Sequence, residues 1–81
     1  MTREQEAEHW LYNYLGELLG GDRPGLASYG LRYDPRSKQQ YIGVEFDQHT
    51  PISVLNRIPK SIKDVHVRVG RVSLALEWAR A

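Results

Sequence analysis

Two hydrophobic periods follow one another along the chain, and the first predicts a helix. Between residues 3 and 19, apolar side chains recur at i, i+3, i+4 and i+7, the spacing of an amphipathic helix with one buried side. Thr2 and Gln5 match a capping box at its start, and Gly20-Gly21 offers a left-handed stop at its end. The side expected to be buried comprises Trp10, Leu11, Leu15 and Leu18.

The second period is a strict alternation, which predicts strands. Residues 27–33 and 41–47 each alternate apolar and polar side chains, and the polar, turn-forming segment 34–38 separates them. We expect these two strands to form an antiparallel hairpin. Thr50-Pro51 then predicts the start of a short helix that ends before Pro59, because Thr can cap and Pro suits the first helical position.

The alternation in residues 65–78 changes phase at Gly70-Arg71. One explanation is a type II′ hairpin turn, which needs positive φ at Gly70 and pairs Val69 with Val72. Another is a single long strand with a β-bulge at Gly70. The third is a strand that ends at Gly70 and is followed by a helix over residues 73–81, which are rich in strong helix formers. The first two explanations make residues 71–81 a strand, and the third makes them mainly a helix. All three give Gly70 a structural role. The alternation itself places the valines and leucines inside and leaves His66, Arg68 and Arg71 outside.

Together these elements predict one α+β domain spanning residues 1–81. The N-terminal amphipathic helix packs on a three- to four-stranded, mainly antiparallel sheet, in the order α-β-β-α-β-β. The length leaves room for one domain only. The expected core comprises Leu31, Ile42, Val44, Phe46, Leu55, Val65, Val67, Val69, Val72, Leu74, Leu76 and Trp78.

Composition and charge narrow the classes of function. The chain has no cysteine, no apolar segment long enough to cross a membrane and a charged N-terminus, so we expect a cytoplasmic protein without membrane association. A formal net charge of +1 disfavours a dedicated nucleic-acid binder. The charges are unevenly placed, however, because residues 3–22 are mainly acidic and residues 57–71 mainly basic.

Three stretches resemble a known module. They are P-G-L-A-S-Y-G-L-R-Y-D-P (24–35), Y-I-G-V-E-F (41–46) and I-P-K-S-I-K-D-V-H-V-R-V-G-R-V (58–72). Together they resemble the small region that precedes the peptidase core in some bacterial trypsin-like proteins. Asp64 stands where that pattern prefers glycine, and His66 where it prefers proline. The resemblance covers about half the chain and implies an accessory or interaction domain without catalysis.

The candidate chemistry points in the same direction. The histidines have no metal-ligand spacing, the serines lack a nucleophile-elbow context, and the glycines match no phosphate-binding loop, so we predict no catalytic, metal or cofactor site. We expect Glu45 to pair with Arg32 or Arg68 across strands.

The predicted function is therefore a non-enzymatic protein-interaction domain. Its partner would be another protein, such as a protease, or a second copy of the chain. The alternative is a small nucleic-acid binder that uses the basic residues of 57–71. The candidate interaction surface comprises Arg32, Tyr41, Glu45, His66, Arg68 and Arg71.

Overall fold

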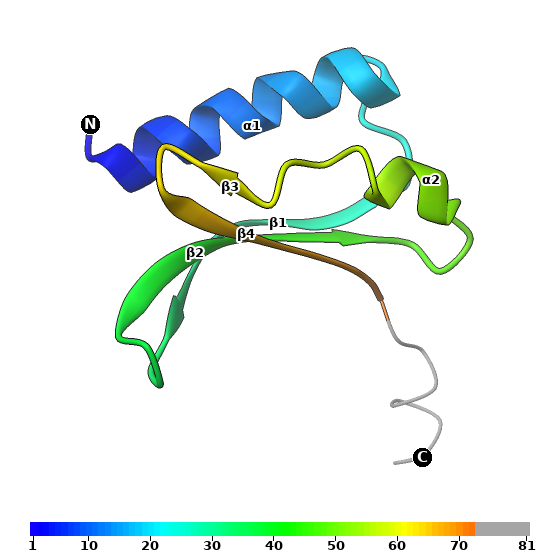
Figure 1. Ribbon diagram of the computed structural model, residues 1–81. Helices are drawn as coiled ribbons and strands as arrows, with labels where there is room; N and C mark the ends of the chain where they lie inside the picture. The colour runs from blue at the N-terminus through cyan, green and yellow to red at the C-terminus, as the bar shows by residue number, and fades with distance from the viewer. Residues whose placement is uncertain (73–81) are drawn as a thin grey trace.

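The fold is a four-stranded sheet with both helices on one side of it (Figure 1). The computed structural model describes residues 1–72. Its elements are α1 (Arg3–Leu19), β1 (Leu26–Asp34), β2 (Gln39–Phe46), α2 (Ile52–Leu55), β3 (Ser61–Ile62) and β4 (Val65–Arg71). The α+β class and the first five predicted elements are confirmed. The predicted strand or helix within residues 71–81 lies, beyond Val72, outside the described residues.

The sheet is mixed, which corrects the expectation of a mainly antiparallel sheet. Its strand order is β1-β2-β4-β3. β1 pairs with β2, and β3 with β4, in antiparallel fashion, but the central β2–β4 pair is parallel. Two neighbouring parallel strands need a crossover connection, and residues 47–64, which include α2, provide it. The same crossover brings α2 to the side of the sheet that α1 covers (Figure 1).

Helix α1 forms as its sequence predicts. The Thr2 hydroxyl accepts a hydrogen bond from the Gln5 backbone N–H at 3.1 Å, and the Gln5 side chain accepts one from the Thr2 N–H at 2.9 Å. Gly20 ends the helix at a φ of 105°. The predicted burial of Trp10 is wrong, because 47% of that residue is exposed and its ring stacks on Tyr14 at the border of the stripe.

The hydrophobic core lies between α1, α2 and the sheet. It contains Ala7, Leu11, Leu15, Ile42, Val44, Phe46, Ile58, Val65 and Val67. The burial predicted for β2 and for the first two valines of β4 is thus confirmed. Leu31, Leu55 and Val69 are partly buried and pack against this core. The predicted core positions Leu74, Leu76 and Trp78 lie outside the described residues.

The turn and the bulge expected at Gly70 are wrong, and the strand does not end there. The helix that the third explanation places after the strand lies outside the described residues. β4 continues through Gly70 to Arg71, in an unbroken register with β2 from Tyr41↔His66 to Phe46↔Arg71. The register excludes a bulge at Gly70, and the φ of Gly70 is not positive, which excludes the turn. The strand also does not end at Gly70, because the Val72 N–H donates to the Phe46 carbonyl at 2.7 Å.

The tight two-residue turn of this region lies earlier, at Lys63-Asp64. These two residues have φ values of 51° and 65° and connect β3 to β4, whose Ile62 and Val65 face each other. Two successive positive φ values define a type I′ hairpin turn, for which Asn-Gly is the usual sequence. The turn was missed because neither residue is a glycine.

Candidate protein-interaction surface

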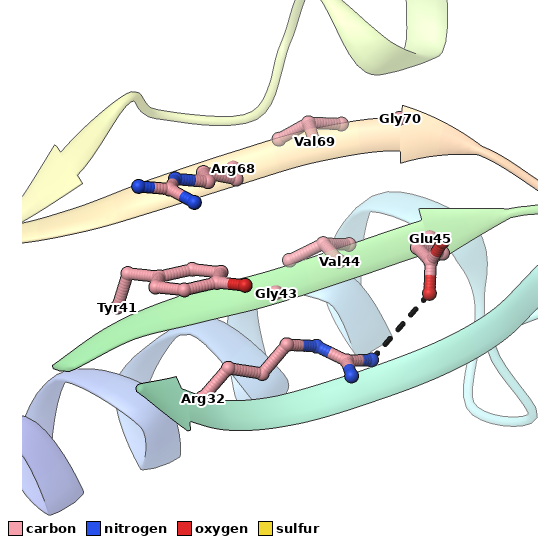
Figure 2. A pocket seen from close by; sticks show the side chains of 8 residues that line it. All are labelled: Arg32, Tyr41, Gly43, Val44, Glu45, Arg68, Val69 and Gly70. Carbon is pink, nitrogen blue, oxygen red and sulfur yellow. Dashed lines mark hydrogen bonds and ion pairs between the residues drawn. The ribbon is translucent and has the colours of Figure 1, made fainter. Parts of the chain in front are cut away.

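The face of the sheet opposite α1 and α2 carries most of the predicted interaction residues. We call this face, with Arg32, Tyr41, Gly43, Glu45, Arg68 and Gly70, the open face (Figure 2). Its side chains come from β1, β2 and β4, and the register sets Arg32 beside Tyr41, and Gly43 beside Arg68. These residues line a shallow hollow of about 310 Å³ in the middle of the face.

Arg68 is held on the open face by two neighbours. Its guanidinium carbon lies 4.0 Å from the centre of the Tyr41 ring, a cation–π contact. Its Nη2 also lies 2.5 Å from Oδ2 of Asp34, at the end of β1. The hydrogen bond from Arg68, followed by one from the Arg36 backbone N–H, lowers the pKa of Asp34 below its ordinary value. The Arg68 side chain is therefore fixed in direction while 48% of it remains exposed.

Arg32 lies across the floor of the hollow. Its Nη2 donates to Oγ of Ser28 at 2.6 Å and lies 3.4 Å from Oε1 of Glu45 (Figure 2). This ion pair confirms the predicted Arg32–Glu45 pairing. A Cβ atom on Gly43 would come within 2.3 Å of Arg32 Nε, so the absence of a side chain at Gly43 makes room for the arginine.

Gly70 lies at the other side of the hollow and has open space above it. A Cβ atom built there meets no described heavy atom within 4 Å. The space above Gly43 is filled by Arg32, so Gly70 is the low point of the hollow, beside the Arg68 side chain. A glycine inside a strand often marks a place where another molecule approaches the backbone closely.

The other two predicted interaction residues do not line the hollow. His66 pairs in register with Tyr41 and lies on the same side of the sheet, as predicted, at the outer edge of β4. It lines a groove there beside Lys60 and Val67. Arg71 shares the inward side of β4 with Val67 and Val69, because the expected change of phase does not occur. The Arg71 residue is exposed, as expected, but its Nε donates to the Thr50 carbonyl at 2.9 Å. Arg71 therefore secures the loop after β2 and does not join the open face.

Asp34, Ser28 and the two glycines also belong to this surface and are not among the residues predicted from the sequence. A register would have revealed Ser28, which lies directly opposite Glu45. Asp34 reaches Arg68 although β2 separates their strands, a contact that depends on the strand order β1-β2-β4. That order rests on the parallel β2–β4 pairing, for which the sequence carries no local signal.

The described part of the chain brings no set of metal-ligating side chains together. No group of three or more His, Cys, Asp or Glu side chains within residues 1–72 could hold an ion. The polar groups of the open face are arginine donors, a tyrosine hydroxyl and two carboxylates that the arginines already engage. Such groups suit the recognition of a second polar surface.

Comparisons with known proteins leave this surface as the main guide to function. Neither a scan against protein-family models nor searches of curated proteins and of solved structures returned a match. Within residues 1–72, neither helix is long and apolar enough to cross a membrane.

Proposed function

We propose that this chain is a non-enzymatic protein-interaction domain whose contact surface is the open face. The observation that carries the proposal is the Arg68–Tyr41 pair, fixed by Asp34 and standing beside a glycine-floored hollow. Arginine and tyrosine are enriched among the residues that dominate protein interfaces. The partner is another protein, a protease or a second copy of this chain being the expected cases, in the cytoplasm.

The fixed side chains favour binding because they lower its entropic cost. A long side chain that orders only on binding costs roughly 0.5–1.5 kcal/mol. Arg68 and Arg32 already have defined partners, Asp34 and Glu45, in the unbound domain. Much of this ordering therefore precedes association.

The same ion pairs disfavour the alternative, a nucleic-acid binder. Phosphate binding relies on cations that can replace released counterions. Here Arg32 and Arg68 are each matched by a carboxylate. Arg57, Lys60 and Lys63 form no ion pair with another described residue and would have to supply the contacts. A gel shift at low salt tests this second candidate, and an absence of shift that persists at low salt contradicts it.

The proposal is tested by comparing two double variants as bait. Tyr41→Ala with Arg68→Ala removes the fixed pair from the open face. The control, Tyr33→Ala with Arg36→Ala, removes one tyrosine and one arginine that do not line the hollow. Tyr33 is an exposed residue of β1, and Arg36 lies in the loop of the β1–β2 hairpin. We expect a partner protein to be recovered from the native cell extract by the wild type and the control, and lost with the first variant.

Equal recovery by both variants would contradict an interface on the open face. Thermal melts of both variants check that a loss of binding is not a loss of folding. Both variants should stay folded, because a surface ion pair contributes only about 0–1 kcal/mol to stability. Light scattering of the purified chain adds the self-association case, in which the wild type is a dimer and the Tyr41/Arg68 variant a monomer.

A further inference from the structure

Among the described strands, β1 forms the longer free edge of the sheet. The strand order β1-β2-β4-β3 places β1 at one end and β3 at the other, and β1 has nine residues whereas β3 has two. No described strand pairs with the outer side of β1. A long edge strand offers backbone groups to the strands of other molecules, and natural proteins commonly block such an edge.

The register identifies the backbone groups of β1 that point to this edge. The Phe46 carbonyl of β2 accepts a hydrogen bond from the Val72 N–H, on the β4 side. Even-numbered residues of β2 therefore direct their backbone groups toward β4, and odd-numbered ones toward β1. The residues of β1 that lie opposite even-numbered residues of β2 point away from it, to the free edge. They are Tyr29, Leu31 and Tyr33.

The carboxylate of Glu8 occupies the middle of this edge. Its Oε2 accepts a hydrogen bond from the Leu31 N–H at 3.1 Å, and Leu31 is the central one of the three outward residues. The Tyr29 hydroxyl donates to the backbone carbonyl of Glu8, which holds this turn of α1 against β1. An approaching strand would have to displace a carboxylate from a backbone amide, and hydrogen bonds with a charged partner are among the stronger ones in proteins.

A second copy of β1 is the strand that fits this edge when the carboxylate is absent. Two β1 strands can pair antiparallel about a two-fold axis between their Leu31 residues, which then exchange both backbone hydrogen bonds. Tyr29 of each copy lies opposite Tyr33 of the other, and cross-strand aromatic pairs stabilise a sheet. Arg32 lies opposite Gly30, so this register brings no like charges face to face. Glu8 therefore blocks the centre of a self-complementary edge.

We propose that Glu8 keeps the outer edge of β1 closed to a second copy of this chain. Helix α1 supplies one carboxylate where a neighbouring strand would supply its carbonyl, and the edge stays unpaired as long as that contact is made. Glu8 and Leu31 do not line the hollow of the open face. The block and the proposed function therefore rest on different contacts, and each can fail while the other holds.

The test compares the self-association of the full wild-type chain with that of Glu8→Ala by sedimentation velocity over a range of concentrations. Alanine frees the Leu31 amide and preserves the helix. We expect Glu8→Ala to associate beyond the wild-type state, with a dissociation constant at least about tenfold lower. Circular dichroism checks that the variant is folded.

Two matched variants separate the contact from the charge. Glu8→Gln retains an acceptor oxygen for the Leu31 amide, and Glu6→Ala removes an exposed carboxylate of the same helix that takes part in no ion pair among the described residues. Both should associate as the wild type does. Association of Glu8→Ala no stronger than that of the wild type, or equally strong in either matched variant, would overturn the proposal.

Amide hydrogen exchange locates the contact between copies. In the wild type, the Leu31 amide should exchange about tenfold or more slowly than the Tyr29 and Tyr33 amides on either side of it. In the associated Glu8→Ala protein, all three amides should be protected. Equal exchange of the three in the wild type would overturn the proposal, and so would new protection in the variant that is confined to the open face, for example to Gly43.

Discussion

Replacement of Gly70 by valine is the perturbation that best tests the observed course of β4. A hairpin turn at this position would need a positive φ, and valine would then strongly destabilise the fold. In the observed strand, the φ of Gly70 is not positive and no described atom lies within 4 Å of an added Cβ. Valine should therefore be accepted, with a gain in stability.

The size of the gain follows from strand preferences. Glycine inside a strand costs roughly 0.5–1 kcal/mol relative to alanine, and β-branched residues add to this within a scale that spans about 1 kcal/mol. We expect Gly70→Val to raise the free energy of unfolding by about 0.5–1 kcal/mol. For a domain of this length, about 1 kcal/mol corresponds to a change in Tm of roughly 4–8 °C. The expected rise in Tm is therefore about 2–8 °C.

The assay is thermal unfolding followed by circular dichroism, with Gly43→Val as the matched control. Both glycines lie on the open face, but a Cβ at Gly43 would come within 2.3 Å of Arg32 Nε and 2.7 Å of its Cδ. That arginine would have to leave Ser28 and Glu45, so the control should show no gain or a lower Tm. A marked fall in Tm for Gly70→Val would refute an extended, unobstructed Gly70.

Three further changes probe the turn, the ion pair and the helix cap. Asp64→Gly should raise stability by about 0.5–1 kcal/mol in urea unfolding, because glycine adopts the positive φ of this turn without strain; an unchanged midpoint would count against the type I′ geometry. The pairing with Arg68 lowers the pKa of Asp34 in the folded state. The stabilisation from this pair is therefore complete at pH values above the ordinary pKa of 3.8, and it is lost as the pH falls through the lower folded-state pKa. Asp34→Asn should flatten that part of the curve of Tm against pH, and an unaltered acid limb would argue against the pair. Thr2→Ala should cost about 1 kcal/mol by removing a cap, seen as a lower Tm, whereas Thr2→Ser should retain it.

Local signals in the sequence were sufficient for α1 and the β1–β2 hairpin. The capping box at Thr2 and the alternation in β2 arise from contacts between near neighbours, which composition and spacing reveal directly. Trp10 was misplaced because it lies at the border of the apolar stripe, where size and spacing alone do not decide burial. Its stacking partner, Tyr14, lies one turn along the same border.

The arrangement of β4 could not be predicted in the same way. Alternation shows that Val65 and Val67 face inward, but it carries no information on which strand pairs with β4 or in which direction. The glycine at position 70 suggested a turn, whereas the real turn has positive φ at Lys63 and Asp64 and contains no glycine.

In the candidate site, too, local patterns predicted which face a residue lies on, but not which residues from different strands meet. Arg32, Tyr41, Glu45 and Arg68 were assigned to one face by their position in the alternation, and the structure brings them together. Arg71 was misassigned because its predicted side depended on the expected change of phase. The ion pair between Arg68 and Asp34 could not be predicted, because it depends on the strand order β1-β2-β4, which only the three-dimensional fold reveals.

Photocrosslinking from the open face tests the proposed function most directly. Tyr41→p-benzoylphenylalanine places a photoreactive ring beside Arg68, and Tyr33→p-benzoylphenylalanine places the same group at an exposed position that does not line the hollow. After irradiation in the native cell, the account predicts one dominant covalent adduct with a single protein from position 41 and none from position 33. The same adduct from both positions, or no adduct from position 41, would contradict an interface on the open face.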